Sequence, residues 1–179
     1  PFILRRLKTD KKIIQDLPDK VENKVYCTLS KKQAALYSCC VDELEEALQE
    51  EENGIKRKGI VLAYLMRFKQ ICNHPAQFSG MGDFCPEDSG KFLCISDLVE
   101  SIASRQEKVL IFTQFKEMTE PLLEYLEQCF HRPGLLLHGG TPVKERAKLV
   151  QSFQKEDGPP FFVLSLKAAG TGLNLTAAN

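Results

Sequence analysis

Three short polar segments, each directly after a run of apolar residues, carry the side chains best suited to bind a ligand. They are Thr113-Gln114-Phe115, His138-Gly139-Gly140-Thr141, and Ser165-Leu166-Lys167 continuing to Asn174. These segments offer hydroxyl groups, and their glycines leave backbone amides accessible, which can point at a phosphate oxygen where a helix begins. One such loop is weak evidence, because Gly-Gly and Gly-x-Gly are common in turns. Three on one surface favour phosphate binding.

The elements around these segments predict that they meet. The apolar runs 109–112, 135–137 and 161–164 are typical of strands buried on both faces of a parallel sheet. A helical pattern with Met118, Leu122 and Leu126 on one face separates the first two runs. A second helix is expected with Thr141 as its N-cap and Pro142 as its first residue. Its inward residues are predicted to be Val143, Ala147, Val150 and Phe153.

This alternation of strands and helices predicts an α/β fold with right-handed parallel crossovers. In such sheets, ligands bind outside the carboxyl ends of the strands. All three polar segments fall at those ends, so we expect them to share one edge of the sheet.

The first half of the sequence is predicted to be helical. Ser30 and Gln33 form a capping-box pattern, and the apolar residues that follow are Tyr37, Val41, Leu44 and Leu48. Asn53-Gly54 ends this helix. A second helix carries Val61, Leu65, Phe68 and Cys72 and ends before Pro75. We expect an antiparallel pair, a loop over residues 77–90, and a further helix over residues 91–104.

Composition excludes several classes of protein. The 179 residues carry 24 basic and 24 acidic side chains. A net charge of zero argues against a protein that coats nucleic acid through an excess of positive charge. The charged residues instead occur in blocks: the first twelve residues have a net charge of +4, residues 42–52 are acidic, and residues 56–69 are basic. Each block alone is equally compatible with a solvated helix face. No apolar run is long enough to span a membrane, and no secretory signal is visible.

Several chemistries find no support. The seven cysteines lack a CxxC pair, so we interpret them as reduced, mostly buried thiols. A zinc site from Cys72, His74, Cys85 and Cys94 is correspondingly disfavoured. Ser165 lacks the GxSxG context of a hydrolase nucleophile. No GxxxxGK[ST] loop occurs in the sequence, so these residues alone are not expected to hold and cleave a nucleoside triphosphate.

Five ordered motifs resemble the SWI/SNF-type ATPases, the DNA translocases of helicase superfamily two. Residues 109–115 (VLIFTQF) resemble motif IV, residues 137–142 (LHGGTP) with Glu145-Arg146 the segment after it, and residues 164–178 (LSLKAAGTGLNLTAA) motif V. Residues 1–8 (PFILRRLK) with 17–20 (LPDK) are similar to the exit from the first motor lobe. Residues 68–75 (FKQICNHP) resemble the helical protrusion that follows it. Arg146 itself is read as a surface helix residue.

The resemblance implies a partial RecA-like parallel sheet with flanking helices, preceded by a helical extension. Residues 1–25 would be the exit from the first lobe and linker, 26–88 the helical protrusion, and 89–179 an incomplete second RecA-like lobe. The final helicase motif would lie beyond the segment. The activity implied is that of a DNA-dependent ATPase in the full-length protein, with the 179 residues inactive alone and containing no catalytic residue and no metal site.

The resemblance also implies roles and partners. Residues expected to contact DNA phosphates are Arg5, Arg6, Thr113, Gln114, Gly139, Gly140, Thr141, Ser165 and Lys167. Residues expected beside the ATP cleft are Gly170, Gly172 and Asn174. ATP and Mg²⁺ would be held by the first lobe, and the partners would be double-stranded DNA, that lobe and a nucleoprotein substrate, with no membrane. The compact protrusion favours a prokaryotic, cytoplasmic and nucleoid-associated protein, nuclear if eukaryotic.

Two alternatives remain open from the sequence. Related motors that share motifs IV and V separate strands, so a strand-separating helicase is one. The other is a non-catalytic protein-interaction module that docks partners on the acidic face from Glu43 to Glu52. A small nucleotide-binding signalling domain conflicts with the absent phosphate loop.

Overall fold

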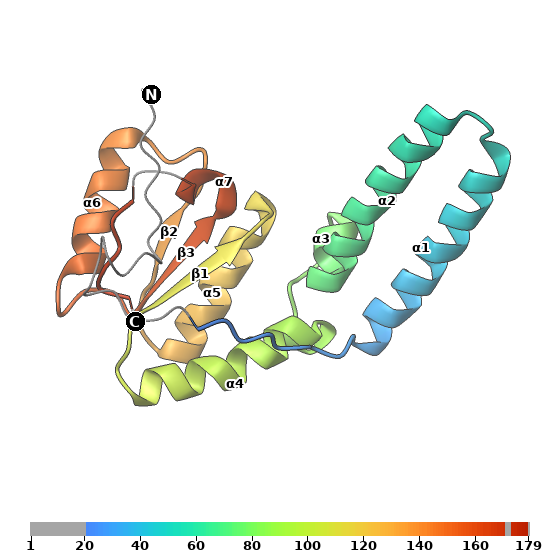
Figure 1. The fold of residues 1–179 in the computed structure, drawn as a ribbon. Coiled ribbons are helices and arrows are strands. Elements are labelled where there is room, and N and C mark those ends of the chain that lie inside the picture. The colour runs from blue at the N-terminus through green and yellow to red at the C-terminus, as the bar shows by residue number, and fades with distance from the viewer. Residues whose placement is uncertain (1–20, 171–172, 179) are drawn as a thin grey trace, which may run out of the picture.

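The computed structural model describes residues 21–170 and 173–178, and Figure 1 shows their arrangement. Arg5, Arg6 and Gly172 lie outside these residues. The elements are α1 (Lys31–Glu50), α2 (Gly54–Asn73), α3 (Pro75–Ser79), η1 (Pro86–Asp88), α4 (Gly90–Ser104), β1 (Val109–Thr113), η2 (Lys116–Met118), α5 (Thr119–Phe130), β2 (Leu135–Leu137), α6 (Val143–Gln154), β3 (Phe161–Ser165) and α7 (Leu166–Ala169). In the described part of the chain, no helix is long and apolar enough to cross a membrane.

The three strands form a parallel sheet in the order β1-β3-β2, which confirms the predicted α/β fold class. Val109 pairs with Phe161 and Thr113 with Ser165, while Leu135 pairs with Phe162. The central strand β3 is buried at all five positions. The prediction that the first strand is buried on both faces was wrong: β1 is an edge strand of the described sheet, and Phe112 is 49% exposed.

Each face of the sheet has its own core. Phe161 and Val163 of β3 pack with α4, η2 and α5, where Met118 of η2 and Leu122 and Leu126 of α5 are buried as predicted. Phe162 and Leu164 point to the other face and pack with Phe153, Leu137 and Leu149. This division follows from the strand geometry, because successive side chains point to opposite faces. Helices on both faces explain why β3 is apolar at its first four positions.

The start of α6 differs from the prediction. The helix begins at Val143, and the hydroxyl of Thr141 accepts a hydrogen bond from the His138 amide (3.2 Å) instead of capping a helix. Val143 is 81% exposed and Ala147 is also exposed. The helix packs on the sheet through its C-terminal half, where the ring of Phe153 lies 5.6 Å from that of Phe162. The helical spacing was therefore correct, but the sheet covers only part of that face.

Helices α1 and α2 form the predicted antiparallel hairpin, which extends away from the sheet (Figure 1). The Ser30–Gln33 capping box and the break at Asn53 are confirmed. The rings of Tyr37 and Phe68 lie 4.6 Å apart between the helices, tilted by 31°. Arg67 on α2 pairs with Glu43 on α1 at 2.7 Å.

The prediction that Val61 and Leu65 face inward holds only in part, because they are 38% and 48% exposed. Each helix of this hairpin has one helical neighbour along most of its length. A single neighbour covers a narrower stripe than the core of a globular domain does.

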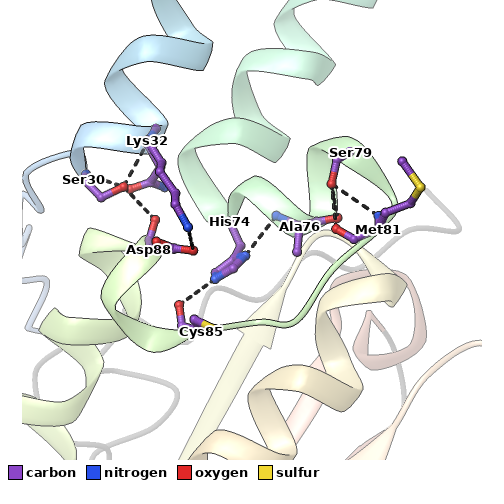
Figure 2. Close-up of polar contacts among 9 residues, drawn as sticks. Ser30, Lys32, His74, Ala76, Ser79, Met81, Cys85 and Asp88 are labelled. Carbon is purple, nitrogen blue, oxygen red and sulfur yellow. Dashed lines mark hydrogen bonds and ion pairs between the residues drawn. The ribbon is translucent and has the colours of Figure 1, made fainter.

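A polar network joins the base of the hairpin to α4. The Gln33 side chain donates to the Ile71 carbonyl (2.8 Å) and accepts from the Gly90 amide (3.1 Å). Ser30 Oγ donates to the Asp88 carbonyl at 2.7 Å. Figure 2 shows this contact beside the Lys32–Asp88 ion pair of 2.6 Å. Because these groups connect four segments, the hairpin and the sheet share one junction.

His74 completes this junction from the end of α2. It is fully buried, its Nδ1 accepts from the Ala76 amide (3.1 Å), and its Nε2 lies 2.9 Å from the Cys85 carbonyl oxygen (Figure 2). With Nδ1 accepting, Nε2 is left to donate to that carbonyl. Both ring nitrogens are thereby occupied by backbone groups.

The cysteines are free thiols, but the expectation that most are buried was wrong. Only Cys40 is buried, and burial raises the pKa of its thiol. Cys27, Cys39 and Cys85 are exposed because they lie on an extended segment, on the outer face of the hairpin and in a loop. Within the described residues, no group of three His, Cys, Asp or Glu side chains is placed to hold a metal.

Replacement of Gly90 by alanine is expected to lower the free energy of unfolding. A Cβ atom at this position would lie 1.7 Å from the Thr28 carbonyl oxygen, so the extended segment would have to move. Overpacking of this kind costs about 1 to 3 kcal/mol. Chemical denaturation measures the change.

Gly59→Ala is the matched control. Gly59 lies within α2 and has open space around it, so alanine should raise helix stability by about 0.5 to 1 kcal/mol. Equal effects of the two substitutions would contradict the close approach at Gly90.

Candidate nucleic-acid interface

The three predicted polar segments meet at one edge of the sheet. Thr113 pairs with Ser165 across β1 and β3, and Leu137 pairs with Leu164, which places His138 beside Ser165. All strands are parallel, so these residues lie at the same carboxyl edge. Neighbouring strands are about 4.8 Å apart, so the three strand ends span about 10 Å.

Two of the hydroxyl residues at this edge, Thr113 and Ser165, differ in availability. Thr113 is 8% exposed, and its Oγ1 accepts from the Phe115 amide and donates to the Phe115 carbonyl, both at 3.4 Å. The Thr113 hydroxyl is therefore occupied by the backbone of the loop that follows β1. Ser165 is 4% exposed, and its hydroxyl has no hydrogen-bond partner among the residues that the structure describes. Ser165 is thus a hydroxyl free to donate to a ligand at the base of this edge.

The glycine loop after β2 is held in shape from α6. Arg146 donates from Nε to the Thr141 carbonyl (3.0 Å) and from a terminal nitrogen to the Gly139 carbonyl (3.4 Å). The Gly140 amide donates to His138 Nδ1 at 3.0 Å. In the described chain the exposed Gly139 amide has no acceptor, so Gly139 presents the free N–H of this loop.

Arg146 and His138 are therefore structural supports of the loop, a role that the sequence analysis missed. Arg146 lies on the surface helix α6, as interpreted, but its guanidinium also reaches back over its own helix start to the loop carbonyls. The five-residue spacing between Thr141 and Arg146 was the one feature of the sequence that could have indicated this contact between the helix and the loop.

Lysines surround the edge. Lys167 on α7 is exposed, as the predicted phosphate contact requires. Lys116 was not predicted, although it directly follows the TQF motif; its Nζ lies 3.9 Å from where a Gly140 Cβ would be. Lys69 on α2 donates to the Gln114 side-chain oxygen at 3.2 Å. These amines give the edge positive charge that the zero net charge of the chain conceals.

Motif V leads away from this edge. Gly170 lies exposed at the end of α7. Residues 173–178 run back along α6 (Figure 1), where Gln154 donates to the Asn174 carbonyl (3.2 Å) and accepts from the Ala177 amide (2.8 Å). Lys108, which directly precedes β1, donates to the Phe153 carbonyl at 2.8 Å. The end of α6 at Gln154 therefore lies near the start of β1, at the edge of the sheet opposite the strand ends. The structure therefore does not bring Asn174 to the strand-end edge with Gly170.

The sequence matches two family descriptions: "Helicase conserved C-terminal domain" over residues 90–179 and "SNF2-related domain" over residues 1–77. It is 39% identical to YwqA of Bacillus subtilis, which carries the name of an ATP-dependent helicase/translocase, and covers 19% of that protein. It is 33% identical to the human SWI/SNF-related matrix-associated actin-dependent regulator of chromatin subfamily A member 1, covering 18% of it. Both matches include the whole of this chain.

Solved structures agree. The Sulfolobus solfataricus SWI2/SNF2 ATPase core in complex with dsDNA matches with a TM-score of 0.84 and 41% identity over the whole chain, which covers 38% of that structure. The C-terminal domain of the Sulfolobus ATPase matches with a TM-score of 0.82 at 38% identity over 89% of this chain, which covers 69% of that domain. The chain belongs to the SWI/SNF-type ATPases of helicase superfamily two. It spans about a fifth of the length of the curated relatives named here.

Arg146→Ala is expected to loosen the glycine loop without unfolding the sheet. The substitution removes two donors to loop carbonyls, each worth about 1 kcal/mol. Amide hydrogen exchange at Gly140 and Thr141, whose amides donate to His138, should accelerate about fivefold or more. Lys144→Ala, an exposed change on the same helix, is the control. Unchanged exchange in the arginine variant would show that the loop holds its shape without this clamp.

Proposed function

We propose that this chain is the second motor lobe of an ATP-dependent translocase that moves on double-stranded DNA. One edge of its sheet would grip the phosphates of one strand. The observation that carries the proposal is the register of the sheet, which brings Thr113, Ser165 and the glycine loop to one edge. A free serine hydroxyl, a free Gly139 amide and the Lys167 amine suit phosphate oxygens.

The contacts proposed for this edge are to the DNA backbone. Backbone amides, hydroxyls and lysines bind phosphates without reading bases, which a motor that advances over any sequence requires. Gly139, Gly140, Thr141, Ser165 and Lys167 would contact the strand directly. Gln114 is exposed and would join them, whereas Thr113 would act by holding the loop that carries Gln114. The Sulfolobus structure, solved as a complex with dsDNA, supports a duplex as the partner.

Nucleotide chemistry would depend on a first lobe. These 179 residues contain no phosphate-binding loop, and the described part contains no cluster of acidic and histidine side chains for a metal. The residues of this chain therefore do not fit an ATP–Mg²⁺ site by themselves. We propose that Gly170 and Gly172 act beside the ATP cleft formed with that lobe, while Asn174, whose carbonyl accepts from Gln154, holds residues 173–178 against α6. Closing and opening of the two lobes would shift their grips along DNA by a hinge movement.

The proposed division of the chain is an exit from the first lobe over residues 1–25, a helical protrusion over 26–88 and a second lobe over 89–179. Arg5 and Arg6 would steady DNA or the first lobe. The identities to bacterial and archaeal relatives exceed that to the human relative named above, which supports a prokaryotic, nucleoid-associated protein acting on a nucleoprotein substrate.

Ser165→Ala combined with Lys167→Ala should weaken DNA stimulation of ATPase activity in the full-length protein. Loss of one hydroxyl and one amine facing phosphate should raise the duplex concentration for half-maximal stimulation about tenfold, equivalent to about 1.4 kcal/mol. ATP hydrolysis is measured against duplex concentration, with Ser104→Ala/Lys148→Ala as the matched surface control.

An unchanged half-maximal concentration in the first double variant would refute the proposed grip. A strand-displacement assay on the same preparation separates translocation from strand separation. Displacement of a hybridised strand would favour the strand-separating alternative.

A further inference from the structure

A cavity of about 350 Å³ lies where the helical hairpin meets the sheet. Its floor is apolar and comes from α4, β1 and α5. Its polar side chains, besides the buried Thr113 of β1, are Lys69 and Asn73 from α2, Lys91 from α4 and Gln114 from the loop after β1. The cavity therefore joins the helical extension to one of the strand ends described above.

The two lysines of this cavity have neutral partners. Lys69 Nζ donates to the Gln114 side-chain oxygen at 3.2 Å, and Lys91 Nζ donates to the Asn73 side-chain oxygen at 2.7 Å. No carboxylate lines the cavity, and neither amine forms an ion pair within residues 21–170 and 173–178. Each ammonium group has three N–H donors, so each keeps two after binding its amide.

Three other cations of the helical extension are neutralised. Lys32 pairs with Asp88, Lys56 with Glu51 and Arg67 with Glu43. The positive charge of Lys69 and Lys91 thus has no acidic partner in the described residues, and both side chains are exposed to a ligand.

The position of these lysines relative to the sheet indicates which anion. Gln114 directly follows β1, the edge strand nearest the hairpin junction, and accepts from Lys69. The line of strand ends from β2 through β3 to β1 therefore continues onto α2 and α4. A strand of nucleic acid that follows this line would reach both amines.

We propose that Lys69 and Lys91 bind phosphates of the nucleic-acid strand, so that the phosphate track extends beyond the sheet onto the helical extension. This inference rests on the proposed function and assigns to the extension a direct part in holding DNA. Gln114 and Asn73 position the two amines, and the phosphodiester backbone is the ligand.

The test is the salt dependence of duplex binding by the full-length protein. Each phosphate contact contributes about 0.9 to the slope of log affinity against log salt, so Lys69→Gln/Lys91→Gln should reduce the slope by about two. Lys31→Gln/Lys58→Gln, which removes two exposed lysines elsewhere on the hairpin, should leave it unchanged. Lys69→Arg/Lys91→Arg keeps both charges and should retain the slope.

A purely structural role gives a different result. Gln114→Ala removes the partner of Lys69 but keeps the charge, so it should leave the slope near that of the unaltered protein even if affinity falls. Reduced affinity of Lys69→Gln/Lys91→Gln with an unchanged slope, at an unchanged melting temperature, would overturn the inference. If Lys69→Gln/Lys91→Gln does not fold, Lys69→Arg/Lys91→Arg provides the test. A reduced slope in this arginine variant, which keeps both charges, would also overturn the inference.

Lys167→Ala separates this inference from the proposed function. A slope reduced by about one in Lys167→Ala, with no change in Lys69→Gln/Lys91→Gln, would overturn the extension and leave the strand-end grip standing. Absence of salt-sensitive duplex binding by the unaltered protein would instead refute the proposed function itself.

Discussion

Parallel pairing of β3 between β1 and β2 is the constraint on which the rest of this structure depends. The pairing of Thr113 with Ser165 and of Leu137 with Leu164 aligns three loops that are far apart in the sequence. A shift of one residue in β3 would turn Phe162 and Leu164 toward the wrong core and move Ser165 out of line with Thr113. The two apolar cores, one on each face, therefore fix the strand-end edge as well as the stability of the fold.

The junction network extends this constraint to the helical hairpin. Gln33 contacts the end of α2 and the start of α4, while His74 is occupied by backbone groups on both ring nitrogens. Since α4 packs in the core that covers one sheet face, the hairpin is held relative to the strand ends. This physical continuity is what places Lys69 against Gln114. The helical extension and the candidate interface are consequently parts of one surface.

Sequence patterns predicted the helices and strands well where the spacing of apolar residues matched a single type of secondary structure. The apolar run of β3 and the capping box at Ser30 identified a buried strand and a helix start, and the order of strands and helices indicated a shared edge. Patterns failed where burial depended on neighbours. Val143 and Val61 have the spacing of core residues but remain exposed, because the sheet does not reach the start of α6 and α1 covers only a narrow stripe of α2. Likewise, Arg146 and Lys69 gained their roles from contacts between elements, which spacing within one element does not encode.

The central claim is that the carboxyl edge of the sheet holds the DNA backbone. Amide hydrogen exchange of the full-length protein with and without duplex DNA tests it most directly. Protection should appear in residues 113–116, 138–141 and 165–167, with the hairpin tip around Asn53 and the opposite edge around Asp157 unchanged. Protection confined to the hairpin tip or to the opposite edge would contradict the account.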